Sequence, residues 1–168
     1  MFRVFALLLA FATPAFAQDA MTADRLADII TDIDPDAAMT ANGIELTIED
    51  IPVLVVMAPG ADRMRAMVPI ASVDDVTPEE MNRMMQANFD TALDARYAVA
   101  NGRVWGVFIH PLAALERDQF LSAIAQTVNL ARTYGTLYSG GAQVFGGGDS
   151  NDIYQGLIDD LLNRGQDI

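Results

Sequence analysis

The dipeptide Asn101–Gly102 constrains the fold of this chain more than any other short segment. An Asn-Gly pair between apolar runs is the strongest short-range indication of a β-hairpin, because both residues tolerate the left-handed backbone of a two-residue turn. We therefore predict a strand over Arg96–Ala100 and a return strand over Arg103–Ile109. His110 and Pro111 follow and are expected to end the pairing.

Three further strands are predicted before this hairpin. Met39–Ile48 alternates apolar and polar residues, with Asn42–Gly43 as a turn or a bulge between its halves. Pro52–Ala58 is almost wholly apolar, which is typical of a strand covered on both faces. Arg63–Ala71 alternates again, and Pro69 near its end indicates an edge position or an early end to the pairing.

Four segments have the apolar spacing of amphipathic helices. The first is Thr22–Ile33, the third is Glu116–Tyr134, and the fourth is Asp149–Arg164. The second begins after Thr77, which forms the capping-box pattern with Glu80. Its apolar stripe is predicted to face the core and comprises Met81, Met84, Met85, Phe89, Ala92 and Leu93.

The order of these elements, α-βββ-α-ββ-α, predicts an α+β domain over residues 18–138. Ser139–Gly148 contains five glycines and is predicted to be a flexible linker. Residues 149–165 then form a C-terminal amphipathic helix. Because the chain contains no cysteine, the fold must rest on packing and not on disulfides.

The N-terminus has the pattern of a cleavable export signal. Met1–Arg3 carries a positive charge, Val4–Ala12 is apolar, Pro14 breaks the helix, and Ala15-Phe16-Ala17 is a small-residue cleavage motif. We expect residues 1–17 to be removed, so that the mature chain begins at Gln18. The apolar stretch is shorter than the roughly 20 residues that a membrane-spanning anchor needs. The mature protein is therefore expected to be periplasmic or secreted, with no stable membrane insertion.

The charge of the chain bears on its partners. Asp and Glu total 23 against 10 basic residues, all of them arginine, for a formal net charge of −13. Nucleic acids and anionic lipid surfaces are bound by basic patches. The composition therefore argues against both as partners.

A resemblance to a known family is carried by three consecutive segments. These are Met85-Gln86-Ala87-Asn88-Phe89, the strand of Ala95–Ala100, and Asn101-Gly102-Arg103-Val104-Trp105 before an apolar strand and a closing helix. Over Thr22–Tyr138 the chain resembles the YbjN family, also called the bacterial sensory transduction regulator-like family, which shares its fold with type III secretion chaperones. The resemblance implies a twisted antiparallel sheet with helices packed against it, often dimeric, in regulators or chaperone-like binders. It implies no catalytic residues.

No motif in the chain predicts catalysis or metal binding. His110 is the only histidine, and a general base needs a partner group that the sequence does not identify. Asp32, Asp34 and Asp36 alternate as in a calcium loop but lack its glycine and final glutamate, so they are interpreted as a helix end. Gly146–Asp149 lacks the lysine of a phosphate-binding loop. We therefore predict neither enzyme activity, nor a cofactor, nor a metal.

Two groups of residues are candidates for partner binding. Tyr97 and Trp105 on the hairpin could form an exposed aromatic face, or could pack into the core. Ile153, Leu157 and Leu161 form the apolar face of the C-terminal helix. That face could fold back onto the sheet or the third helix, or dock on another subunit or protein.

Together with the export signal and the C-terminal helix, the resemblance implies an exported, non-enzymatic binding or chaperone-like protein that binds a polypeptide and forms a homodimer. One alternative is a binder of small apolar ligands, because methionine-rich surfaces adapt to varied apolar molecules. The less favoured alternative is a periplasmic enzyme that uses His110 and neighbouring carboxylates. The methionines of the ligand alternative, for which an adaptable core is the favoured interpretation, are Met57, Met64, Met67, Met81, Met84 and Met85.

Overall fold

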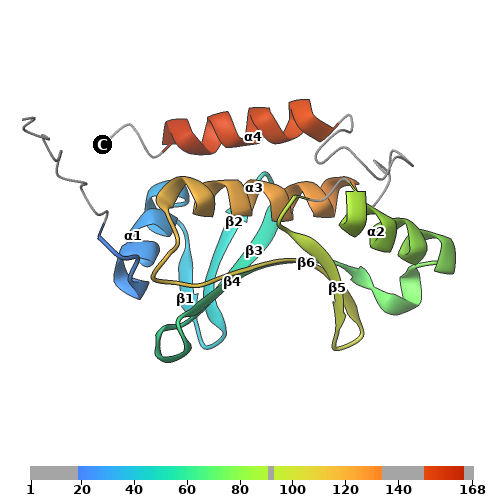
Figure 1. Cartoon of the computed structure of the whole chain (residues 1–168), viewed down its shortest axis with the longest axis horizontal. Helices are drawn as coiled ribbons and strands as arrows, with labels where there is room; N and C mark the ends of the chain where they lie inside the picture. The colour runs from blue at the N-terminus through green and yellow to red at the C-terminus, as the bar shows by residue number, and fades with distance from the viewer. Residues whose placement is uncertain (1–18, 91–92, 134–149, 165–168) are drawn as a thin grey trace, which may run out of the picture.

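The computed structural model describes residues 19–90, 93–133 and 150–164 (Figure 1). The predicted export signal (residues 1–17) and glycine-rich linker (residues 139–148) lie outside the described residues. Within the described ranges, no helix combines the length and apolar character that crossing a membrane requires.

The centre of the fold is one six-stranded sheet with the order β1-β2-β3-β4-β6-β5. All neighbouring strands pair antiparallel, which confirms the predicted α+β class. The strands are β1 (Ala38–Thr40), β2 (Gly43–Ile48), β3 (Ile51–Ala58), β4 (Arg63–Ser72), β5 (Arg96–Ala100) and β6 (Arg103–His110).

Five strands are predicted from the sequence, and the structure has six because a turn divides one of them. Asn101 and Gly102 have φ values of 51° and 70°, as the predicted β5–β6 hairpin requires. The segment predicted as one strand over residues 39–48 is two strands, β1 and β2, paired with Thr40 opposite Gly43. The structure therefore has a turn here and not a bulge, but the turn residues are Ala41 and Asn42, one position earlier than predicted, and Gly43 already belongs to β2.

Proline 69 does not mark an edge strand, because β4 lies between β3 and β6. The alternative, an early end to pairing, holds on the β3 side, where the register stops at Met67. On the β6 side the pairing continues to Ser72 with an irregularity between Pro69 and Ala71. The strand accommodates a proline in the sheet interior because β3 no longer pairs with β4 there.

The main helices are α1 (Ala23–Ile33), α2 (Pro78–Asp90), α3 (Arg117–Thr133) and α4 (Ser150–Arg164), and short 3₁₀ turns span Pro59–Ala61 and Val73–Asp75. Figure 1 shows these helices on one side of the sheet. Helix α3 crosses the sheet, and α4 lies over α3 on the side away from the sheet. The molecule thus has three layers: the sheet, α3 and α4.

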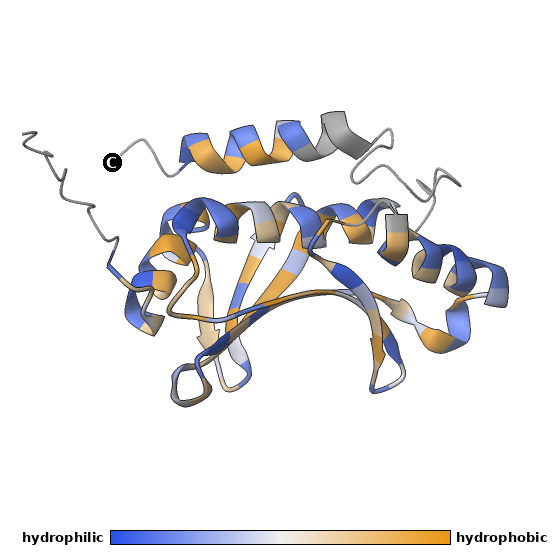
Figure 2. Cartoon of the chain, viewed as in Figure 1, coloured by the Kyte–Doolittle hydropathy of each residue, from blue (hydrophilic) through white to orange (hydrophobic). Residues whose placement is uncertain are grey.

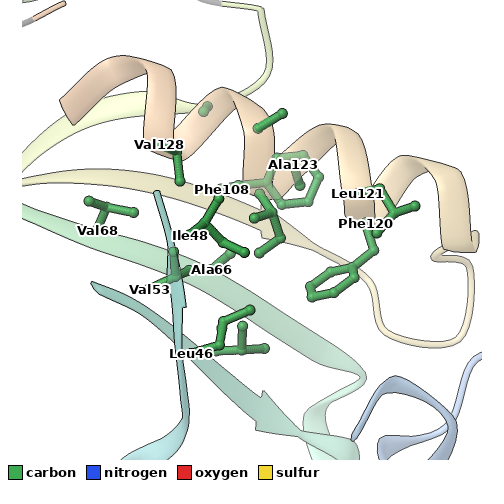
Figure 3. Packing of buried hydrophobic residues seen from close by; sticks show 14 of the residues in the cluster. Leu46, Ile48, Val53, Ala66, Val68, Phe108, Phe120, Leu121, Ala123 and Val128 are labelled. Carbon is green, nitrogen blue, oxygen red and sulfur yellow. The ribbon is translucent and has the colours of Figure 1, made fainter. Parts of the chain in front are cut away.

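The core lies between the sheet and α3 (Figure 3). Gly106 of β6 permits this close packing, since a Cβ atom there would lie 3.1 Å from the Thr127 carbonyl oxygen of α3. The side chains that meet in this layer are Leu46, Ile48, Val53, Ala66, Val68 and Phe108 from the strands, and Phe120, Leu121, Ala123 and Val128 from α3. Because α4 covers its other side, α3 is buried over most of its surface.

Helix α2 corrects one sequence prediction. Its predicted core stripe included Met85 and Phe89, yet these side chains are 42% and 70% exposed. Met84 is buried as predicted, and the other buried residue is Ala87, which the predicted stripe did not include. The reason is Asn88, whose Oδ1 accepts from the Tyr97 amide at 2.7 Å and whose Nδ2 donates to the Tyr97 carbonyl at 3.0 Å. This pair of bonds fixes which side of α2 meets β5 and turns Met85 and Phe89 outward.

The start of α2 gives a pH-dependent prediction. The Glu80 carboxylate accepts from the Thr77 amide at 2.8 Å, and the Glu80 amide donates to the Thr77 hydroxyl at 3.2 Å. These bonds to Thr77 hold the pKa of Glu80 below its ordinary value of 4.5. A carboxylate whose pKa is lowered by folding stabilises the helix above pH 4.5, and this contribution is lost as the pH falls through the lowered pKa. A carboxyl chemical-shift titration should give Glu80 a midpoint below 4.5, and a midpoint at or above 4.5 would contradict the prediction.

Candidate partner-binding surface

The two faces of the sheet differ in what covers them. On β3, Val53 and Val55 are buried beneath α3, whereas Leu54 and Val56 point to the opposite face and are half-buried. No described helix lies over that opposite face (Figure 1). The prediction that β3 is covered on both faces is therefore correct for one face only. The second apolar face of this strand has no cover among residues 19–90, 93–133 and 150–164.

The strand register joins these residues into one surface. Leu54 lies opposite Met67, which in turn lies opposite Val107 of β6. At the next position along β4 on the same face, Arg65 lies between Val56 of β3 and Ile109 of β6. Residues directly opposite in an antiparallel pair point to the same face. We call this surface the open face and define its apolar stripe as Leu54, Val56, Met67, Trp105, Val107 and Ile109.

Basic residues share the open face. Arg63 and Arg65 of β4, Arg96 of β5 and Arg103 of β6 occupy its outward positions. Glu45 of β2 is the one carboxylate that the described strands place there. The open face is therefore locally positive on a chain whose net charge is −13.

The two aromatic candidates lie on opposite faces of the hairpin. Tyr97 is 4% exposed, and its hydroxyl donates to the Leu130 carbonyl of α3 at 2.9 Å. Tyr97 therefore packs in the core, which was the alternative considered for it. Trp105 is half-buried on the open face, and its Nε1 donates to the Ala100 carbonyl at 3.1 Å. The predicted joint aromatic face is not formed, and only Trp105 belongs to the candidate surface.

The apolar face of α4 is used within the chain. Leu157 is 2% exposed and Leu161 is fully buried, and α4 packs on α3 and approaches α1. Figure 2 shows the apolar side of α4 turned toward α3 and its polar side turned to solvent. Ile153 belongs to the same helix, but its side chain lies outside the described residues. Of the arrangements considered for this helix, the structure has folding back onto the third helix.

A cleft of about 580 Å³ opens at the end of β6 that contains His110. The imidazole stacks on Phe108 with ring centroids 5.8 Å apart. Its Nδ1 lies 2.8 Å from the Pro111 carbonyl oxygen, and because a carbonyl only accepts, Nδ1 carries the proton. The cleft is lined by Asp94, Arg96, Phe108, Ile109, His110, Asp118, Gln119 and Ser122. This contact holds the imidazole to the backbone of the next residue and does not itself pair it with a reacting group.

Neither the metal pattern nor the methionine cluster forms a site. Asp34 accepts from the Thr47 amide at 2.7 Å and from the Asp36 amide at 3.0 Å, so it joins the end of α1 to β2. Among the described residues, no group of three metal-ligating side chains converges. Met64 is buried in the core whereas Met67 lies on the open face, so these methionines do not line one apolar cavity.

Comparisons with known proteins inform the fold. No family model matches the chain, and no curated protein matches it. Among solved structures, a chain of the ExsC–ExsE complex matches with a TM-score of 0.53 and 13% identity, over 68% of this chain and 94% of that chain. A chain of the HopA1–SchA chaperone–effector complex matches with a TM-score of 0.49 and 9% identity, over 66% and 93%. At 13% identity the ExsC–ExsE match shows a likeness of fold alone. Membership of the YbjN family stays a prediction.

The sequence patterns did not predict the open face, although one signal for it was present. Alternation in β4 and β6 identifies two faces per strand, but it does not identify which face a helix will cover. The signal was the wholly apolar β3, whose pattern requires a cover on both sides.

Proposed function

We propose that this protein is an exported, non-enzymatic, chaperone-like module that binds a polypeptide on the open face of its sheet. The observation that carries the proposal is the uncovered apolar stripe, in which Ile109 is 54% exposed. Contiguous apolar residues on the surface of a soluble protein mark interaction sites. The stripe spans β3, β4 and β6, which gives an extended polypeptide lying along the strands an apolar surface several strands wide.

The open face favours a polypeptide over a small apolar ligand. Small molecules bind in concave, mostly apolar cavities. The cleft beside His110 is instead lined by several charged and polar side chains and contains no methionine. The solved structure that matches with a TM-score of 0.53 is a protein complex, that of ExsC with ExsE. This context supports a protein partner.

A pair of variants tests the proposal. Ile109 and Val99 lie on neighbouring strands and are 54% and 53% exposed, but they point to opposite faces of the sheet. A charged side chain on the binding surface loses its hydration when a partner covers it, and this loss costs binding free energy. We expect Ile109→Asp to weaken binding about tenfold or more, which corresponds to about 1.4 kcal/mol. The probe is reduced and carboxymethylated ribonuclease, a permanently unfolded polypeptide, and binding is measured by fluorescence anisotropy of the labelled probe.

Val99→Asp is the matched control, and we expect its affinity to equal that of the original protein. Circular dichroism and urea unfolding of both variants check that the fold is intact. Equal affinities for the two aspartate variants would contradict the assignment of the open face. Absence of measurable binding by the original protein, with its fold intact, would contradict the proposed function.

Export and self-association are part of the proposal and have direct tests. N-terminal sequencing of protein recovered outside the cytoplasm should begin at Gln18. For the homodimer, the exposed side chains of Met85 and Phe89 on α2 supply an apolar surface separate from the open face. Light scattering of the mature chain should give the mass of two chains. The mass of one chain would contradict self-association.

A further inference from the structure

The apolar stripe of the open face is surrounded by arginines. Along β6 the outward residues run from Arg103 through Trp105 and Val107 to Ile109. Arg65 of β4 lies directly opposite Ile109. On the other side of β6, Arg96 of β5 lies opposite Val107. The part of the apolar stripe on β6 therefore has Arg103 near its Trp105 end and Arg65 beside its Ile109 end. Arg96 comes from the strand beside its middle.

These cations lack anionic partners within the described part of the chain. Its ion pairs involve other arginines, namely Arg83, Arg117, Arg132 and Arg164. Arg96 donates instead to the backbone carbonyls of Leu93 and Ala95, just before β5, and lines the cleft that Ile109 also lines. No carboxylate in residues 19–90, 93–133 or 150–164 forms an ion pair with Arg65 or Arg103.

We infer that the open face selects polypeptide segments in which carboxylates flank a short apolar run. This inference rests on the proposed function and names the chemistry of its partner. Arg103 and Ile109 are six residues apart, which is about 20 Å along a strand, the span of about seven extended residues. The apolar side chains of such a segment cover Trp105, Val107 and Ile109, and its terminal carboxylates reach Arg103 and Arg65.

Charge excludes two other occupants of the same surface. A second copy docked face to face about a two-fold axis would bring a set of arginines against an identical set, and like charges in contact are unfavourable. Nucleic acid carries a charge at every phosphate, so a chain with a net charge of −13 repels it at long range more strongly than a segment with two flanking carboxylates, and it offers no apolar run to cover the stripe. An acidic and apolar polypeptide matches both the stripe and its cations.

Three labelled peptides test the inference. They share one central apolar run and carry Glu, Gln or Lys at the flanking positions. Exposed ion pairs are individually weak, so we expect the Glu peptide to bind about fivefold more tightly than the Gln peptide at low salt. We expect the preference to shrink at about 1 M salt, where charges are screened within about 3 Å. The Arg65→Gln/Arg103→Gln double variant should bind the Glu and Gln peptides equally.

The control is Arg25→Gln/Arg164→Gln, which makes the same change in net charge on helices away from the open face and should keep the preference. Equal binding of the Glu and Gln peptides by the original protein, or tighter binding of the Lys peptide, would overturn the inference and leave the proposed function standing. Displacement of the Glu peptide by a single-stranded oligonucleotide at equal concentration would also overturn it. Failure of all three peptides to bind, together with failure of the unfolded ribonuclease probe, would overturn the proposed function itself.

Discussion

Replacing Phe120 by alanine is expected to lower the free energy of unfolding by about 3–5 kcal/mol. Phe120 is fully buried at the start of α3, in the layer between this helix and the sheet (Figure 3). The substitution removes apolar contacts and leaves a cavity that the surrounding strands refill only in part. Because a domain of this size is stable by only about 5–15 kcal/mol, the loss is a large share of the total. Urea unfolding followed by circular dichroism measures it.

The comparison variant is Met39→Ala, which also removes a large apolar side chain. Met39 is 71% exposed on the edge strand β1, so we expect its free energy of unfolding to change by no more than about 0.5 kcal/mol. Similar losses for Phe120→Ala and Met39→Ala would contradict the placement of the core between α3 and the sheet.

Replacing Gly43 by alanine is expected to cost at least about 2 kcal/mol. Gly43 begins β2 with φ of 138°, a conformation that L-residues rarely adopt. A Cβ atom at this position would lie only 2.3 Å from the carbonyl oxygen of Val55, which is backbone and can move only by shifting β3. The strain and the overlap add, and both act where β1, β2 and β3 meet.

Gly60→Ala is the control for this prediction. Gly60 lies in the 3₁₀ turn after β3, and a Cβ atom there would have no neighbour within 4 Å. Its stability should change by no more than about 0.5 kcal/mol. If both alanine variants unfold at the same urea concentration as the original protein, the backbone geometry at Gly43 is not as described.

Features governed by local chemistry could be predicted from the sequence. Thr77 and Glu80 form the predicted capping box, and Thr22 caps α1 by accepting from the Arg25 amide at 3.2 Å. Asn101–Gly102 forms the predicted hairpin. In each case a side chain or backbone preference acts within a few residues, so a short sequence pattern contains the necessary information.

Features set by contacts between distant segments could not be predicted in the same way. The orientation of α2 depends on bonds between Asn88 and Tyr97 on the edge of β5, which no helical periodicity reveals. Gln126 of α3 is 6% exposed and accepts from the amides of Asp94 and Ala95. The apolar spacing of α3 gives no sign of this role. Whether α4 docks in the same chain also depends on tertiary packing, because an apolar helix face does not specify its partner.

The open face belongs to this second group. Alternation predicts that Trp105 and Val107 share one side of β6, but not that α3 covers the other side. The location of the candidate site therefore depends on which face of the sheet the helices cover, which is a property of tertiary packing.

Trp105 offers the most direct test of the central claim, since it is the only tryptophan of the chain and lies on the open face. The measurement is its fluorescence in the mature protein as the tryptophan-free, unfolded ribonuclease probe is added. If a polypeptide covers the open face, the emission should shift to shorter wavelength and acrylamide quenching should fall with the same midpoint as the anisotropy titration. Saturable binding of the probe with unchanged Trp105 emission and quenching would contradict the claim, because the partner would then lie elsewhere on the protein.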